Sequence, residues 1–137
     1  MIRCDHIFIT GARRVHRLHS QILQNLFAPY RNATLYHSGC RWYSDTPSDP
    51  YRGVDGVAHG CWPPDQVVVM EADRDQYGIG AGLIRNGEMR AVAAELRSRG
   101  DRVLFAAFPG EKSRDVRDCI ERFAGFPMIV IPLDQLC

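Results

Sequence analysis

Short apolar runs alternate along the chain with segments whose apolar residues recur at helical spacing. Five runs rich in β-branched and aromatic residues predict strands, at 6–10, 34–38, 66–71, 102–108 and 127–132. The middle three runs are almost continuously hydrophobic, which is typical of strands buried on both faces of a parallel sheet. We therefore expect a sheet of about five strands, mostly parallel.

Three segments between these runs predict amphipathic helices. Their apolar stripes are Val15, Leu18, Ile22 and Leu26 in the first, Met89, Val92, Ala93 and Leu96 in the second, and Val116, Cys119, Ile120 and Phe123 in the third. Ser113 is a suitable N-cap for the third helix, and Gly100 a suitable residue just after the second. Strands that alternate with helices in this way are typical of βαβ units. The predicted fold class is α/β and Rossmann-like, with helices on both faces of the sheet.

The segment 41–52 has neither helical nor strand periodicity. It carries Trp42, Tyr43, two prolines, two serines and two aspartates, and we expect a mobile or ligand-covering loop. No repeat, low-complexity tract or linker divides the chain, so residues 1–137 are expected to form a single domain.

Composition and charge exclude several classes of protein. The 137 residues include 17 basic and 16 acidic ones, and 45% are hydrophobic, which is ordinary for a globular domain and unlike a disordered tail or a polybasic nucleic-acid arm. The apolar runs are far shorter than the ~20 residues that a membrane span requires. The first residues lack the pattern of a secretory signal, so we expect a cytoplasmic protein. The five cysteines are scattered and never spaced C-x-x-C, which favours free thiols.

Glycine follows each of the first four predicted strands. The segments are Thr10-Gly11-Ala12-Arg13, Ser38-Gly39-Cys40, Ala72-Asp73 leading to Tyr77-Gly78 and Ala81-Gly82, and Pro109-Gly110 leading to Ser113-Arg114. A single such glycine is explained by a tight connection between strand and helix. Four of them at the carboxyl ends of parallel strands favour a ligand crevice in which backbone amides bind an anion.

These segments resemble the YspA-like branch of the SLOG superfamily, which is related to the LOG and DprA proteins. The first two motifs of that branch correspond to residues 10–13 and to 38–40 with Gly53-Val54-Asp55-Gly56-Val57-Ala58. Its most distinctive signature corresponds to Ala81-Gly82, Arg85-Asn86 and Met89, and its last motif to residues 107–114 with Gly125-Phe126-Pro127. The resemblance covers residues 8–131 in the expected order.

The resemblance implies a Rossmann-like domain that binds a nucleotide or a nucleotide-derived molecule at the strand ends. The positions that would contact this ligand are Thr10, Gly11, Arg13, Ser38, Gly39, Asp55, Asp73, Tyr77, Gly82, Arg85, Asn86, Pro109, Gly110, Ser113 and Arg114. LOG relatives hydrolyse the N-glycosidic bond of nucleoside 5′-monophosphates with an arginine and an acid, which correspond here to Arg85 and Asp118. Both would be catalytic only if this chain is an enzyme.

The fourth loop departs from the family pattern. Asp115-Val116 stands where the branch usually has Gly-Thr, and Glu111 stands where a second glycine is common. Acids in the first turn of a helix use its positive dipole end themselves and repel a phosphate placed there. The departure favours a binding module that senses or sequesters its ligand, with a LOG-like phosphoribohydrolase as the alternative.

Each candidate side chain also has a structural interpretation. Arg85, Arg13 and Arg114 suit a bidentate grip on phosphate, but Arg114 could instead pair with Asp118. Asp118 fits glycosidic bond cleavage and equally an ordinary first-turn acid. Asp73 is expected to fix its loop or a ribose hydroxyl, and Ser38 to bind phosphate or cap its own turn. The aromatic residues Tyr77, Tyr43 and Trp42 could stack on a base or belong to the packing.

Two further partners are weighed and not adopted. The ligand types in His37-x-x-Cys40 and His59-x-Cys61 suit zinc, but their spacing matches no recognised finger, and we expect neither a metal nor a cofactor. The basic residues 13–17 could contact DNA, as in a DprA-like single-strand binder, but they lack a wider basic face. We expect a nucleotide-derived small molecule as partner, no nucleic acid and no membrane. The resemblance also implies a homodimer or higher homo-oligomer, paired through helices beside the strand ends.

Overall fold

A computed structural model describes residues 3–40 and 51–136 of the chain. Five strands in these residues form one parallel sheet in the order β3-β2-β1-β4-β5. The strands are β1 (His6–Gly11), β2 (Thr34–His37), β3 (Val67–Val69), β4 (Val103–Phe108) and β5 (Met128–Val130). This confirms the predicted Rossmann-like α/β fold class.

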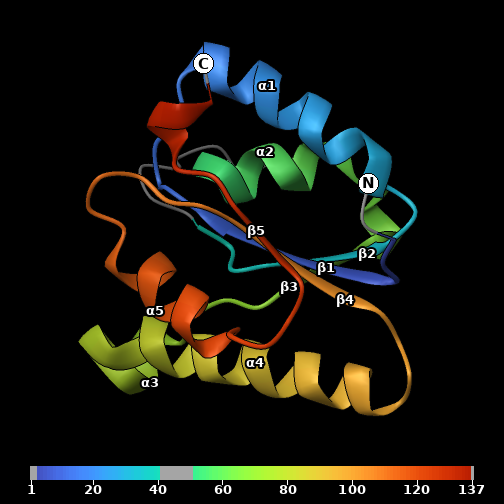
Figure 1. The fold of residues 1–137 in the computed structure, drawn as a ribbon. Helices are drawn as coiled ribbons and strands as arrows, with labels where there is room; N and C mark the ends of the chain where they lie inside the picture. Colours follow the sequence, from blue (N-terminus) through green and yellow to red (C-terminus); the bar gives the residue numbers. More distant parts are fainter. Residues whose placement is uncertain (1–2, 41–50, 137) are drawn as a thin grey trace.

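Helices cover the sheet on both faces (Figure 1). One face carries α1 (Arg17–Phe27) and α2 (Gly53–Cys61), and the other carries α3 (Arg74–Tyr77), α4 (Ala81–Ser98) and α5 (Arg114–Arg122). Short 3₁₀ turns η1 (Ala28–Tyr30), η2 (Pro64–Gln66), η3 (Gly78–Gly80) and η4 (Leu133–Gln135) complete the connections. Among the described helices, none is both long and apolar enough to cross a membrane.

Alternation along the central strands divides the core into two layers. Ile7 and Ile9 of β1 point to the α1 and α2 face, where they meet Leu23 and Phe27. Phe8, between them, points to the α4 and α5 face and stacks on the Tyr36 ring, with ring centroids 4.3 Å apart. β4 is buried along its whole length. Because β1 and β4 lie at the centre of the sheet, the strand ends that carry the candidate site are rigidly placed.

Two expectations for the strands need correction. The third run was expected to form a buried strand at 66–71, but β3 is three residues long and lies at the edge of the sheet, where Val68 is 40% exposed. The fifth is likewise limited to Met128–Val130, between Pro127 and Pro132, and proline cannot donate a ladder hydrogen bond.

The helices also differ from the pattern in two ways. Helix α1 buries His19, Leu23 and Phe27, whereas its expected inner stripe includes Leu18, which is 59% exposed. Residues 53–61 form helix α2, which no periodicity predicted. Most of the expected loop at 41–52, with Trp42 and Tyr43, lies outside the described residues.

Candidate functional site

The carboxyl ends of β1 and β4 mark the point where the strand order reverses. From β1 the chain proceeds to β2 and β3 on one side, and it then crosses to β4 and β5 on the other. In open α/β sheets this switch point is where ligands bind. The loops that leave β1 and β4 begin at Ala12 and Pro109, and the loop after β2 begins at Ser38. The candidate site is therefore built from residues at these three strand ends, with α2 and α4.

Asp55 is buried at the start of α2 and is held by the end of β2. Ser38 Oγ donates a hydrogen bond to Asp55 Oδ2 at 2.6 Å, and the Cys40 amide donates to the same oxygen at 3.1 Å. Burial raises the pKa of Asp55 to about 6, although both hydrogen bonds and the nearby charge of Arg85 oppose the rise. Asp55 Oδ1 is enclosed and has no hydrogen-bond partner among the described residues. The group is thus a buried carboxyl that titrates close to neutral pH.

Arg85 lies on the inner face of α4 with only 8% of its surface exposed. Its Nη1 donates to the Ser38 carbonyl at 3.1 Å, and its Nε donates to Asn86 Oδ1 at 2.9 Å. Burial lowers the pKa of Arg85, and the charge of Asp55 opposes this effect. Nη2 has no partner among the described residues and is not fully enclosed. The N–H donors of Nη2 therefore remain available to an anion.

Asn86 joins Arg85 to helix α5. Its amide nitrogen donates to the Asp115 carbonyl at 2.8 Å and to Asp118 Oδ2 at 3.1 Å. Asp118 in turn accepts a hydrogen bond from Arg122 Nε at 2.8 Å, one helical turn further along α5. The structure thus brings Ser38, Asp55, Arg85, Asn86 and Asp118 into one connected network.

The loop after β4 satisfies its own polar groups. The Gly110 amide donates to Ser113 Oγ at 2.8 Å, directly before α5. The Asp115 carboxylate, in the first turn of α5, occupies the space where a side chain at Gly82 would lie. A phosphate at this helix N-terminus would meet that carboxylate. The positive end of α5 is therefore already used by an acid of the chain.

The four glycines of the strand ends permit close packing rather than outline one open cradle. A Cβ on Gly11 would lie 2.5 Å from Val54 Cγ2, and one on Gly110 would lie 2.9 Å from Ala12 Cβ. Gly39 has a φ of 70°, a conformation that side chains disfavour, and Glu71 occupies the space beside it. The expected convergence of the glycines thus consists of contacts between neighbouring elements.

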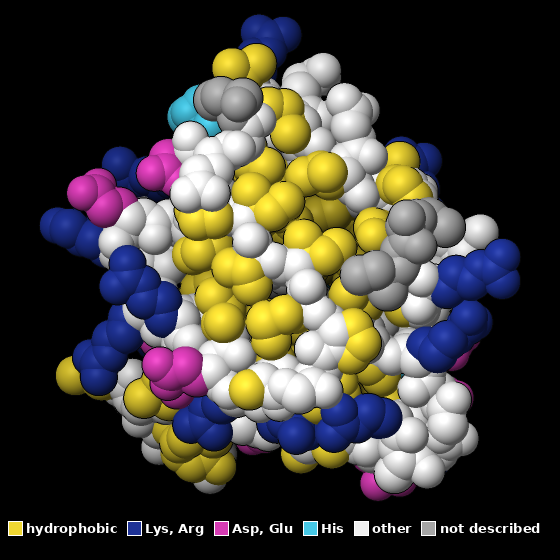
Figure 2. All heavy atoms as spheres, viewed as in Figure 1, with side chains coloured by type: hydrophobic (Ala, Val, Ile, Leu, Met, Phe, Trp, Pro, Cys, Tyr) yellow, Lys and Arg dark blue, Asp and Glu magenta, His cyan; other side chains and the backbone are white. Residues whose placement is uncertain are grey.

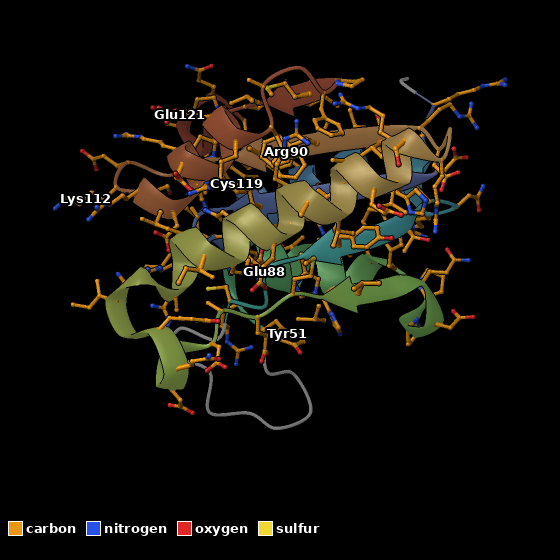
Figure 3. The ribbon with its side chains drawn as sticks, turned by 90° about the horizontal axis from the view of Figure 1, so that it is seen from below. Tyr51, Glu88, Arg90, Lys112, Cys119 and Glu121 are labelled. Atoms are coloured by element: carbon orange, nitrogen blue, oxygen red, sulfur yellow. The ribbon has the colours of Figure 1, made fainter. Side chains whose placement is uncertain are left out.

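The remaining candidates lie around this network. Arg13 and Arg114 are exposed, as is Lys112, which points away from the body of the molecule in Figure 3. None of the three has a polar side-chain partner among the described residues. Asp73 caps α3 by accepting from the Gln76 amide at 3.0 Å. Thr10 is buried in β1, and the Pro109 carbonyl accepts a hydrogen bond from the Leu133 amide. Tyr77, at the end of α3, is exposed.

Beside the site, His37 and His59 form a hydrogen-bonded pair that the sequence did not predict. His37 Nε2 and His59 Nδ1 are 2.9 Å apart, and the Gly39 amide donates to His37 Nδ1 at 3.0 Å. His37 therefore donates through Nε2, and neither of its nitrogens is available to a metal. Among the described residues no three His, Cys, Asp or Glu side chains are grouped as metal ligands. Burial and the neighbouring His59 lower the pKa of His37 to about 3.

Comparison with family models, with curated proteins and with solved structures finds no match to this chain.

Proposed function

We propose that this protein binds a nucleotide or a nucleotide-derived small molecule over the carboxyl ends of β1, β2 and β4, and senses or sequesters it. The observation that carries the proposal is how the side chain of Arg85 is hydrogen-bonded. Its buried guanidinium is held through Nε by an amide oxygen and through Nη1 by a backbone carbonyl, and its Nη2 has no partner among the described residues. A guanidinium nitrogen with N–H donors to spare suits a phosphate oxygen.

The surroundings of Arg85 give the ligand its orientation. Exposed Arg13 and Lys112 lie on the loops beside the switch point, and exposed Arg114 begins α5. These three residues supply further positive charge to a ligand with several phosphates. The start of α5 carries Asp115 and repels phosphate. We therefore place the phosphates on the side of β2 and Arg85. The resemblance to the YspA-like branch supports the same class of ligand.

The binding proposal is tested by isothermal titration of the chain with nucleoside mono-, di- and triphosphates, ADP-ribose and cyclic ADP-ribose-type molecules. We expect at least one ligand to bind with a Kd below ~100 µM, and Arg85→Gln to weaken that ligand at least about tenfold. Arg90→Gln is the matched control, because Arg90 is on the same helix but stacks on Phe126. Failure of the whole panel to bind contradicts the proposal, as does equal binding by both variants.

A LOG-like nucleoside 5′-monophosphate phosphoribohydrolase is the second candidate. The hydrogen-bond chain from Arg85 through Asn86 to Asp118 favours it, because this chain joins a phosphate-binding group to a carboxylate. Chromatography of the titration mixtures for free base separates the two functions. Release of base that Asp118→Asn and Arg85→Gln both abolish assigns the hydrolase. Binding without release assigns the sensing or sequestering function.

A further inference from the structure

Helix α1 presents a row of apolar side chains to solvent. Leu18 is 59% exposed and Leu26 is 37% exposed, and the half-buried Ile22 lies one turn from each. Residues four apart share one face of a helix. The helix contacts the core with a different row, which contains Leu23 and Phe27. Leu18, Ile22 and Leu26 are called the outer row below. Ile22 also packs against the edge of the core, whereas Leu18 and Leu26 leave much of their apolar surface in solvent.

An apolar groove adjoins the outer row. It has a volume of about 300 Å³, and it is lined by the end of α1, by η1 and by strands β1, β4 and β5, through Ile7, Asn25, Leu26, Phe27, Pro29, Tyr30, Ala106, Phe108, Ile129 and Ile131. Figure 2 shows hydrophobic side chains gathered over the middle of this face, which is hollowed there. Because Leu26 belongs to both, the row and the groove form one continuous apolar surface.

This surface carries almost no charge. Arg17, at its first position, is the one charged residue among the eleven of α1. None of the side chains that line the groove is charged. Surface helices usually carry charged residues on their solvent face, whereas the buried centres of protein interfaces are depleted of charge and enriched in apolar groups. The composition of α1 is that of an interface helix.

We propose that two copies of this chain associate about a two-fold axis, with the outer row of α1 from each copy seated in the groove of the other. A two-fold interface requires one surface to be complementary to itself. A ridge beside a groove meets this requirement. A neutral face also avoids the repulsion that arises when a charged residue lies opposite its own copy.

The proposal is tested by sedimentation velocity on the full chain between ~1 and ~100 µM, a range in which specific dimers dissociate measurably. We expect the mass to rise from 15.5 kDa to twice that value. Asn25→Arg places a like charge in each groove and is expected to raise the dissociation constant at least about tenfold. Asn25 is exposed, so this variant should fold. Leu18→Arg is expected to act in the same direction.

Ile79→Arg is the matched control. Ile79 is 98% exposed in η3, on the opposite face of the sheet, so its replacement should leave the dimer intact. Hydrogen exchange of the unaltered chain provides a readout that needs no variant. Amides of 18–30 and 128–131 should gain protection with concentration, and those of 74–84 should not.

Three outcomes overturn the proposal. The chain could remain a monomer at every concentration, which would leave the groove to a different occupant such as a small apolar molecule. A dimer could survive both Asn25→Arg and Leu18→Arg. A dimer could instead be lost with Ile79→Arg, which would place the interface on the helices beside the strand ends. None of these results bears on ligand binding, so the two proposals fail separately.

Discussion

Ser38 connects the two buried charges of the candidate site. Its hydroxyl donates to Asp55, and its backbone carbonyl accepts from Arg85. No direct hydrogen bond joins Asp55 to Arg85 among the described residues, although each charge shifts the pKa of the other. The end of β2 therefore sets the separation of the two groups. A phosphate bound at Arg85 Nη2 would lie near Asp55, and the ionised form of that carboxyl would repel it.

At the same scale, we expect Asn86→Ala to destabilise the fold by about 2–4 kcal/mol, since it leaves buried polar partners unsatisfied on both sides. Arg85 Nε would lose its acceptor, and the Asp115 carbonyl would lose its donor. Arg122→Ala is the control, because the Arg122–Asp118 pair is partly exposed and worth less than about 1 kcal/mol. Urea unfolding measures the stability lost in each variant. Equal costs for the two variants would contradict a structural role for the network.

The sequence identified several members of the network but not their contacts. Ser38, Arg85 and Asn86 were predicted as site residues because each lies in a family-like motif after a strand. The hydrogen bonds, however, join residues 47 and 32 positions apart in the chain, and local spacing carries no information about such pairs. The mutual pairing of His37 and His59 had no signal either, because the two residues are 22 positions apart in the chain.

Among the elements, α2 depends on the absence of a side chain at Gly11. A Cβ there would lie 2.5 Å from Val54 Cγ2 and 2.8 Å from the Phe108 carbonyl oxygen. We expect Gly11→Ala to cost about 1–3 kcal/mol of stability, through displacement of α2 from the end of β1. Gly60→Ala is the matched control within α2, where a Cβ meets nothing within 4 Å, and it should stabilise the helix by about 0.5–1 kcal/mol. Loss of stability in both variants would contradict this account.

The elements that sequence patterns predicted incorrectly are those that tertiary contacts determine. Helix α2 contains three glycines in nine residues, a composition with low helix propensity, and it forms because Val54 and Ala58 are fully buried. In α1 the pattern favoured the row with Leu18 and Leu26 as the inner face. The true inner row includes the buried polar His19, which a count of apolar residues does not recognise. Strands β1, β2 and β4 were predictable because their β-branched and aromatic runs are buried.

For the whole molecule, His37 and Asp55, both buried beside the site, change the free energy of unfolding with pH in opposite directions. The folded-state pKa of His37 is about 3 against 6.5 unfolded, so the unfolded chain binds an extra proton and stability falls as pH drops from 6.5 to 3. The folded-state pKa of Asp55 is about 6 against 3.8. The stability that this raised pKa contributes is fully present below pH 3.8 and is lost as pH rises through 6. Between pH 3.8 and 6 the two slopes cancel.

Replacing Asp55 should therefore reveal the slope of His37. We expect Asp55→Asn to lose about 3 kcal/mol of stability between pH 6 and pH 3.8 relative to the unaltered chain, because the 2.2-unit difference in the pKa of Asp55 converts at 1.36 kcal/mol per unit. Urea unfolding at half-unit steps of pH measures the profile. Asp75→Asn, at an exposed position in α3, should reproduce the original profile. Parallel profiles for Asp55→Asn and the unaltered chain would show that Asp55 is ionised throughout this range, and the pKa of about 6 given to this buried carboxyl would then be wrong.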